Sequence, residues 1–276
     1  MPWHAQLDLD YRFEAPRTLL HHQHNGPLRI LKSLYPEGDA ICHNVVIHPP
    51  GGLVGGDRLD LNLKLASGAH ALVSTPGATR FYASDEADAV QQVNIHLEPG
   101  ARLEWLPLEA IAHPGCRAQN RLSATLGEGA EMLGWDVTAL GLPASGQPFD
   151  HGSYQQRIEL PGRWLEQARI DATDTRLMDS PLGLGGRRCL GSLWLACGTA
   201  LARERREQLL EVVREVLQSA GMNVDAGATC PHPQLLVVRA VAPVVEPLMA
   251  LFQQVWGALR PAAWGLNNTP PRIWRV

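Results

Sequence analysis

Residues 48–84 read HPPGGLVGGDRLDLNLKLASGAHALVSTPGATRFYAS, and this stretch decides the fold that the sequence predicts. Leucines stand at every second position from Leu59 to Leu65, with polar residues between them, so a strand would carry all the leucines on one face. The Gly55-Gly56 pair invites comparison with a phosphate-binding loop. Such a loop needs Gly-Lys-Ser/Thr ahead of a helix, whereas here the glycines precede Asp57 and a strand. The stretch therefore predicts β structure and no phosphate cradle.

The turn within this stretch recurs twice. Three segments share strand alternation, a Gly-Ala turn at the same offset and a second strand: 61–73 (LNLKLASGAHALV), 93–105 (VNIHLEPGARLEW) and 122–134 (LSATLGEGAEMLG). Their glycines Gly68, Gly100 and Gly129 would supply the positive φ that tight turns need. Such turns are also common in β proteins without repeats, but the shared lead-in favours a true repeat. Repeated units bury each other's faces when they stack.

These segments predict a mostly β fold in which stacked β-hairpin repeats form a layered or helicoidal core. Residues 156–170 (QRIELPGRWLEQARI) would be a fourth, degenerate unit. Two α-helices are expected near the C-terminus, at 201–220 and at 244–259, the second ended by Arg260-Pro261. A short buried strand, 235–240, lies between them. We expect one domain over residues 1–276, with the repeat core at about 40–200 and the helical part at about 201–276.

Composition narrows the class of protein. A hydrophobic content of 45% with 19% charged residues is typical of a globular protein. The net charge of −4 lacks the basic excess of nucleic-acid-binding proteins. The N-terminus shows no signal peptide and no stretch is long enough to span a membrane, so we expect a cytoplasmic protein. The five cysteines are widely spaced, without a C-x-x-C pair, which predicts free thiols.

Motifs for hydrolytic chemistry are missing from the sequence: it has no G-x-S-x-G elbow and no H-E-x-x-H helix. His21, His22 and His24 could bind a transition metal, although a solvated loop explains them as well. Cys230 and His232, two residues apart, could chelate nickel or zinc, or could simply form a turn before a strand. Both metal interpretations stay open.

Five acidic residues are stronger candidates because they lie on or beside strands that otherwise read as buried: Asp57, Glu104, Glu109, Asp136 and Glu166. A carboxylate facing an apolar interior is costly unless it is paired, hydrated or holding a cation. Carboxylates with water bind divalent ions without the grip of thiolates, which suits a metal in transit. Two alternatives remain: surface carboxylates paired with nearby arginines, and a small-molecule hydrolase that uses Asp57 and Asp136.

The tryptophans divide into two groups. Trp105 and Trp135 alternate inward on the repeats and are expected in the core. The C-terminal end is rich in proline, tryptophan and arginine, and aromatic residues with arginine are enriched at interface cores. We therefore expect a partner surface there, formed by Trp256, Arg260, Trp264, Arg272 and Trp274.

Short blocks along the chain resemble the urease accessory protein D family. They are HPPGG (48–52), GGD (55–57), TPGATRFY (75–82), LEWLP (103–107), GWD (134–136), ASG (144–146) with Phe149, LRP (259–261) and PRIW (271–274). Together they cover nearly the whole chain from about Cys42, and their order and spacing are specific. Three positions depart from the usual pattern: Leu108 replaces a polar residue, Leu142 an arginine and Gln147 a glutamate.

The resemblance implies a non-catalytic chaperone of urease maturation. Such a protein would dock on the urease apoprotein, bind the accessory proteins F and G, and convey nickel to the urease active site. It would hold no tight cofactor, only transient Ni²⁺, and would bind neither nucleic acid nor membrane. The family's internal water-filled passage would place Asp57, Asp136 and Glu166 in or near the path of the metal.

Overall fold

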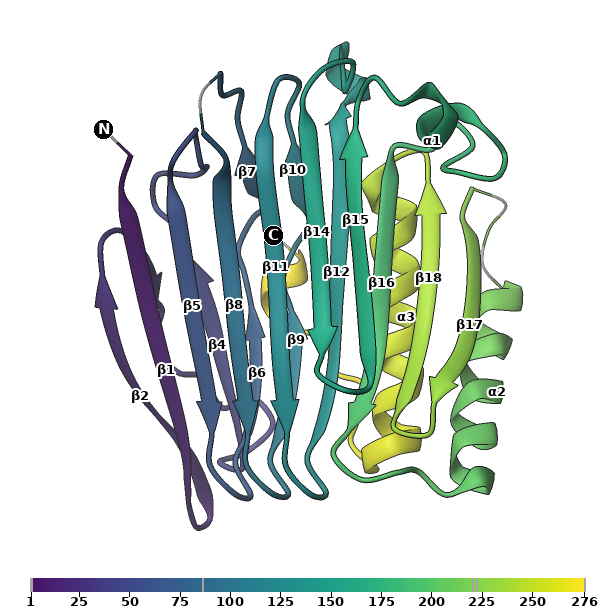
Figure 1. Cartoon of the computed structure of the whole chain (residues 1–276). Coiled ribbons are helices and arrows are strands. Elements are labelled where there is room, and N and C mark those ends of the chain that lie inside the picture. The colour runs from purple at the N-terminus through teal and green to yellow at the C-terminus, as the bar shows by residue number, and fades with distance from the viewer. Residues whose placement is uncertain (1, 86, 220, 222, 276) are drawn as a thin grey trace.

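Two β-sheets packed face to face form the body of the protein in the computed structural model, which describes residues 2–85, 87–219, 221 and 223–275 (Figure 1). The first sheet has seven strands in the order β15-β14-β11-β8-β5-β1-β2. Their bounds are β1 His4–Glu14, β2 Arg17–Asn25, β5 Arg58–Leu65, β8 Ala89–Leu97, β11 Arg117–Leu126, β14 Ser153–Leu160 and β15 Trp164–Asp171.

The second sheet has eleven strands, eight of them in the order β17-β18-β16-β12-β9-β6-β4-β3. Their bounds are β3 Arg29–Ile30, β4 Ile41–Ile47, β6 His70–Ser74, β9 Arg102–Leu106, β12 Glu131–Leu142, β16 Cys189–Cys197, β17 Asp225–His232 and β18 Leu235–Ala242. Three short strands complete it: β10 (Ala110–Ala112) and β13 (Gln147–Pro148) pair with β12, and β7 (Thr79–Phe81) pairs with β10.

Each repeat unit crosses from one sheet to the other. β5 lies in the first sheet and, after the turn at Gly68, β6 lies in the second; β8–β9 and β11–β12 follow the same course. Like strands of successive units then pair in parallel, β5 with β8 and β8 with β11. The glycines Gly68, Gly100 and Gly129 have φ of +77°, +71° and +66°, as expected for these turns.

The predicted class, a mostly β core of stacked repeats with two longer helices near the C-terminus, is confirmed. The pairing within a unit is corrected: its two strands do not form a hairpin, because their inward side chains fill the space between the sheets. Packed sheets stand about 10 Å apart, twice the spacing of paired strands. Residues 156–170 behave in the opposite way, since β14 and β15 pair antiparallel as a true hairpin within one sheet.

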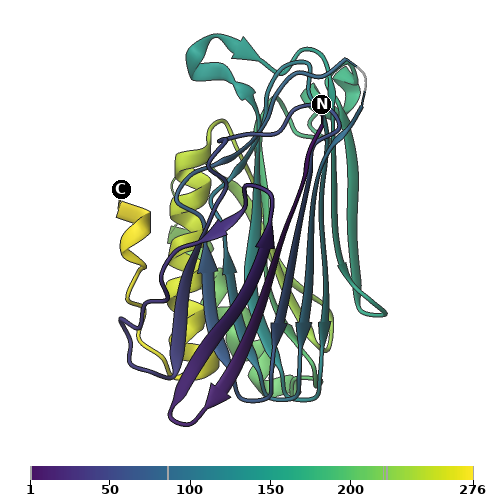
Figure 2. The same ribbon diagram turned by 90° about the vertical axis from the view of Figure 1, so that its left-hand side faces the viewer.

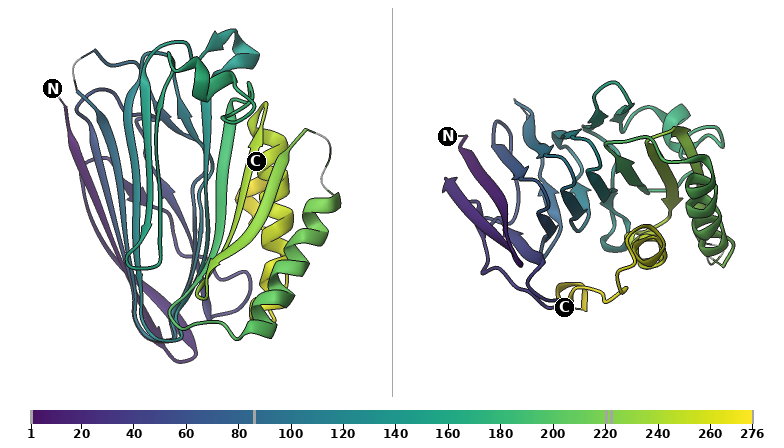
Figure 3. Two further views of the ribbon diagram at one scale, coloured as in Figure 1. Left: turned by 45° about the vertical axis from the view of Figure 1, so that its right-hand side comes forward. Right: turned by 90° about the horizontal axis from the view of Figure 1, so that it is seen from below.

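Helices cover the outer face of the eleven-stranded sheet, as Figures 2 and 3 show. α3 (Val245–Trp264) packs on β12, β16 and β18, and α2 (Arg203–Ser219) packs on α3 and β17. Both helices and the buried strand between them were predicted, although Ala220, the last residue expected in the first helix, lies outside the described residues. Within the described part of the chain, no helix has the length and apolar character needed to cross a bilayer.

α3 is longer than predicted, because it continues through Pro261 to Trp264. Proline in a helix removes one backbone hydrogen bond. The helix nevertheless continues until Gly265, whose φ of +67° ends it and whose N–H donates to the carbonyl of Pro261. The side chain of Arg260, described below, holds this last part against the sheet.

The N-terminal strands extend the first sheet. β1 pairs in parallel with β5, and its Leu7, Leu9 and Tyr11 point into the core between the sheets. Sequence analysis did not identify these strands, although β1 shows the same alternation as β5. A helix of one turn, α1 (Thr175–Asp179), connects the end of the first sheet to β16, and two 3₁₀ turns lie at Pro143–Ser145 and Arg272–Arg275.

The central part of the eleven-stranded sheet is buried on both faces. One core lies between the two sheets and includes Leu103 and Trp105, and the other lies between the sheet and the helices and includes Trp135 and Phe252. Both tryptophans expected in the core are therefore there. In consequence, a polar side chain on these strands faces a dry environment whichever way it points, and it needs partners.

We predict that Gly100→Ala lowers the free energy of unfolding by about 1 kcal/mol, because an L-residue is strained at φ +71° even though its Cβ would meet no atom within 4 Å. Gly77→Ala is the matched control, since its Cβ also meets nothing within 4 Å and its φ is not positive. Urea unfolding of both variants decides the point. Equal effects of the two substitutions would contradict the turn assignment.

Candidate functional site

A layer of polar side chains crosses the space between the two sheets. On the eleven-stranded sheet, Asp136, Ser192 and Arg239 are direct neighbours on β12, β16 and β18. The facing row of the other sheet carries Gln91, Asn120 and Gln156 on β8, β11 and β14. With Glu166 of β15, these seven residues are called the polar layer here. Each of the seven lies on a different strand, so the layer depends on the register of both sheets.

Asp136 occupies the centre of the polar layer. Its carboxylate accepts hydrogen bonds from Asn120 Nδ2 at 2.8 Å and from Gln156 Nε2 at 2.5 Å. Burial disfavours the charged form and the charge of Glu166 adds to this, so the pKa of Asp136 is raised to about 6. Among the residues that the structure describes, no cationic side chain pairs with Asp136. This buried carboxylate therefore has neutral donors and no protein counter-charge.

Glu166 connects the polar layer to the surface. Its carboxylate accepts a hydrogen bond from Ser192 Oγ at 2.5 Å and pairs with Arg239 Nε at 2.6 Å. The side chain of Arg239 is 56% exposed. The layer thus runs from the interior to the edge of the sandwich, where it ends at the exposed guanidinium of Arg239.

A cavity of about 160 Å³ lies at the opposite end of the polar layer. Gln91 lines it and donates to Asn120 Oδ1 at 3.1 Å, which links the cavity to Asp136. Most of its other walls are apolar, among them Leu59, Leu61 and Trp105. Exposed glycines of two loops also line the cavity, so it reaches the surface.

Asp57 has a different environment from Asp136. It is 2% exposed, and its two carboxylate oxygens accept the backbone N–H groups of Trp3 at 3.2 Å and Val54 at 3.0 Å. This arrangement ties the N-terminal strand to the glycine-rich turn. The geometry gives Asp57 a structural role, and its part in a metal passage stays a prediction.

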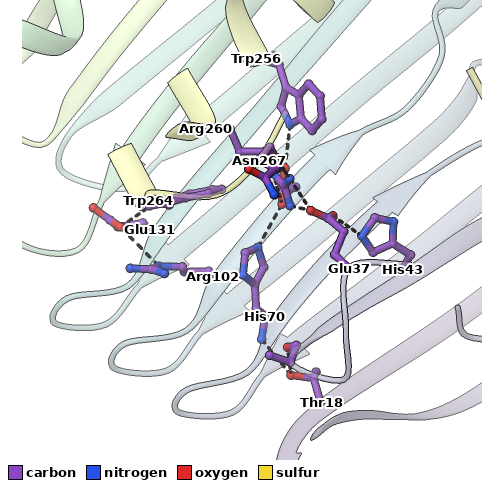
Figure 4. Close-up of polar contacts among 12 residues, drawn as sticks. Thr18, Glu37, His43, His70, Arg102, Glu131, Trp256, Arg260, Trp264 and Asn267 are labelled. Atoms are coloured by element: carbon purple, nitrogen blue, oxygen red, sulfur yellow. Dashed lines mark hydrogen bonds and ion pairs between the residues drawn. The ribbon is translucent and has the colours of Figure 1, made fainter. Parts of the chain in front are cut away.

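Glu104 contacts Trp256 and Arg260 of α3, both of which Figure 4 labels. Trp256 Nε1 donates to it at 2.7 Å, Arg260 Nε lies 3.0 Å away and His70 Nε2 lies 3.1 Å away. Burial opposes ionisation, but the hydrogen bond from His70 and the charges of His70 and Arg260 outweigh it, so the pKa of Glu104 is lowered. These contacts place Glu104 on the helix side of the sheet, away from Asp136, and its part in a metal passage stays a prediction.

Arg260 connects Glu104 to a second carboxylate. Its guanidinium lies 2.6 and 2.8 Å from the oxygens of Glu37, which also contacts His43 Nε2 at 2.8 Å. These partners lower the pKa of Glu37 to about 2, despite partial burial. Arg260 also donates to the carbonyl of Asn267. This network, the Arg260 clamp, joins α3 and the following segment to the outer face of the sheet.

Glu109 belongs to neither group. It is half-buried and lines a second cavity of about 370 Å³ at the start of α3. Leu108 and Leu142, two of the positions that depart from the family pattern, line the same cavity together with Trp274. The five acidic candidates therefore occupy four separate places, and only Asp136 and Glu166 come together.

The expected partner surface is only partly exposed. Trp256 and Arg260 are 1% and 0% exposed, so the interface interpretation is wrong for these two side chains, which form the core of the clamp. Trp264 is half-buried and donates to Glu131 at 2.7 Å, and Trp274 is half-buried against Trp135 and Trp256. Arg272 is exposed, and its role in partner binding stays a prediction.

The histidine and cysteine candidates do not gather into a metal site. The rings of His22 and His24 stack on the exposed edge strand β2, with centroids 6.4 Å apart. His232 Nδ1 accepts the backbone N–H of Gln234, as in a turn. Within the described residues, no group of three or more His, Cys, Asp or Glu side chains has a metal-binding arrangement.

Sequence analysis missed several neutral members of the site, notably Asn120, Gln156 and Ser192. A signal for two of them was present, because Asn120 and Gln156 stand at inward positions of alternating strands, where the flanking inward residues are Ala118 and Leu122 or Tyr154 and Ile158. A polar residue at an inward position calls for a buried partner.

Comparisons with known proteins agree on one family. The family model described as UreD urease accessory protein matches residues 4–275. The chain is 58% identical over 274 residues, 99% of each chain, to a protein of Variovorax paradoxus named Urease accessory protein UreD. Proteins of the same name from Polaromonas sp. and Paracidovorax citrulli are 57% and 59% identical over the full length of both chains.

We predict opposite pH effects for two buried carboxylates. The folded pKa of Asp136, about 6, exceeds the usual 3.8, so the folded state takes up a proton first as pH falls. The wild type should then gain about 3 kcal/mol relative to Asp136→Asn between pH 6 and 3.8. Glu37, with a folded pKa of about 2 against 4.5, should show the reverse: the wild type loses stability relative to Glu37→Gln below pH 4.5. Urea unfolding at several pH values measures both differences, and parallel profiles would refute the assignments.

We predict that Arg260→Met destabilises the protein by about 3–5 kcal/mol, because it removes the arginine shared by Glu104 and Glu37 and leaves each carboxylate with only a histidine as basic partner. Arg102→Met is the control, since Arg102 is 40% exposed and its pair with Glu131 should contribute less than about 1 kcal/mol. Adding Glu104→Gln to Arg260→Met should recover part of the loss. Strictly additive effects in this double-mutant cycle would contradict the clamp.

Proposed function

The chain belongs to the UreD urease accessory protein family, with a role in urease maturation, and we propose that it conveys nickel to apo-urease as a non-catalytic scaffold. In this proposal it docks on the urease apoprotein and binds the F- and G-type accessory proteins in the cytoplasm. Nickel is its cargo, and it keeps no resident cofactor. The exposed Arg272 and the half-buried Trp264 and Trp274 are our candidates for partner contacts.

The observation that carries the proposal is the unpaired carboxylate of Asp136 between the sheets. A buried charge without a counter-ion is costly, and proteins usually pair it or neutralise it by protonation. A pKa of about 6 leaves Asp136 mostly ionised at neutral pH. A divalent cation that enters the polar layer loses part of its hydration shell. The negative charge of Asp136 would offset this cost, because electrostatic attraction is stronger where little water is present.

The rest of the polar layer offers oxygen ligands along the same direction. The side-chain amides of Gln91 and Asn120 lie between the cavity and Asp136, and Glu166 lies toward the surface. Amide, hydroxyl and carboxylate oxygens hold nickel less strongly than thiolates or several imidazoles do. Weak ligands suit a carrier, because the cargo must leave again.

The buried cysteines support a protein that passes nickel on rather than one that holds it. Burial raises the pKa of Cys116, Cys189 and Cys197 to about 12, so these groups stay protonated at neutral pH. Only the thiolate binds metal strongly. These three protonated thiols would therefore not hold nickel tightly.

A hydrolase that uses Asp57 and Asp136 was the alternative from the sequence. Both oxygens of Asp57 are occupied by backbone N–H groups, which leaves it poorly placed as a base or nucleophile. We therefore favour a nickel carrier over a hydrolase.

We predict that Asp136→Asn lowers nickel-dependent urease activation several-fold at limiting nickel while leaving the accessory complex intact. Asparagine keeps the shape of the side chain but removes the charge that compensates the cation. The measurement is urease activity and nickel content per apo-urease after co-expression with the accessory proteins, with a pull-down in parallel.

Glu131→Gln is the matched control. Glu131 lies on the same strand, is buried, and pairs with Arg102 and Arg205 on the helix side of the sheet. It should leave nickel delivery unchanged once equal folding is verified by thermal melting. Full activation by Asp136→Asn, or equal losses in both variants, would argue against a passage through the polar layer.

A further inference from the structure

One side chain that lines the cavity beside the polar layer has no role in the nickel passage proposed above. His48 lines this cavity together with Gln91, Thr75 and otherwise mainly apolar residues. At about 160 Å³, the cavity has room for several water molecules. Exposed Gly51 and Gly77 on its wall place it beside the surface. A hydrated ion could therefore reach it from solvent.

His48 Nε2 is buried and makes no hydrogen bond with the described residues. Two other buried imidazoles are paired, His43 with Glu37 at 2.8 Å and His70 with Glu104 at 3.1 Å, whereas His113 Nε2 is unpaired like His48 Nε2. Buried polar atoms normally have a partner, so an unpaired one on a cavity wall points to a ligand. The residue that carries this atom lines the cavity, so space for a ligand lies beside it.

The chemistry of the imidazole suits a metal ion better than an anion. Burial lowers the pKa of His48, although the charge of Asp57 opposes the effect, so the ring is neutral at neutral pH. A neutral imidazole can offer a nitrogen lone pair, which nickel favours as a ligand. Trp3 packs against the ring, with centroids 5.0 Å apart, and so limits its rotation.

We propose that His48 Nε2 binds a hydrated nickel ion in this cavity, as the first protein ligand on the way to Asp136. This inference rests on the proposed nickel passage and assigns its starting point. From the cavity, Gln91 bonds to Asn120 and Asn120 to Asp136, so each step passes to an oxygen-bearing neighbour. One nitrogen ligand with water in the other positions selects a transition metal over Mg²⁺ or Ca²⁺, yet releases it readily.

The test uses two variants of the full chain, purified with its accessory partners. His48→Phe keeps a ring against Trp3 and removes both nitrogens, so it should fold as well as the wild type. His113→Gln is the matched control, because His113 Nε2 is also buried and unpaired but borders a different hollow, beside Tyr82.

Ni²⁺ is titrated while the backbone amide signals of Gly51 and Gly77 are followed by NMR. We expect paramagnetic broadening of these signals in the wild type and in His113→Gln, and its loss in His48→Phe. Mg²⁺ at the same concentrations should shift neither signal. Broadening that survives in His48→Phe, or that is confined to the exposed histidines of β2, would overturn the assignment.

Urease activation at limiting nickel is measured in the same variants. A several-fold loss in His48→Phe alone, with a normal melting temperature, supports a ligand on the path. If Asp136→Asn impairs activation and His48→Phe changes neither activation nor broadening, the passage stands and His48 has no part in it. If broadening depends on His48 but neither variant impairs activation, the metal site stands and the proposed function fails.

Discussion

Burial of one sheet on both faces is the constraint on which the rest of this structure depends. The stacked repeat units make β6, β9 and β12 parallel neighbours at the centre of the eleven-stranded sheet, and the seven-stranded sheet and the helices then exclude water from its two faces. Parallel sheets are usually covered in this way. Any charged side chain on these strands must be neutralised within the protein, and the chain solves the problem differently on each face.

On the helix side, Glu104 receives a buried arginine and its pKa falls; on the other side, Asp136 receives only amides and a hydroxyl, and its pKa rises. Glu104 is fully buried and Asp136 is half-buried on the neighbouring strand, so exposure alone does not explain why the less exposed carboxylate has the lowered pKa; the difference comes from their partners. A carboxylate that already has its cation gains little from a second one, whereas Asp136 still lacks one. In the proposed function, this contrast gives Glu104 a structural role and leaves Asp136 free to meet a passing cation.

The local parts of this arrangement could be predicted from the sequence. Glycine turns with positive φ and period-two leucines depend on neighbouring residues, and both were predicted correctly. Alternation does not reveal which strand lies beside which, so the units were expected as hairpins although they span two sheets. Asp136 was found because it interrupts an apolar strand. Arg260 was taken for a surface residue because its partners are distant in the chain, and a buried ion network leaves no local pattern.

The Arg260 clamp limits the order in which parts of the chain can fold during synthesis. Glu104 and Glu37 precede Arg260 by 156 and 223 residues. During synthesis both carboxylates leave the ribosome long before their cation does, so the outer face of the sheet cannot close around them until the last tenth or so of the chain has emerged. Until then the two carboxylates on that face stay charged and hydrated, and the face of the nascent sheet is accessible to a binding partner.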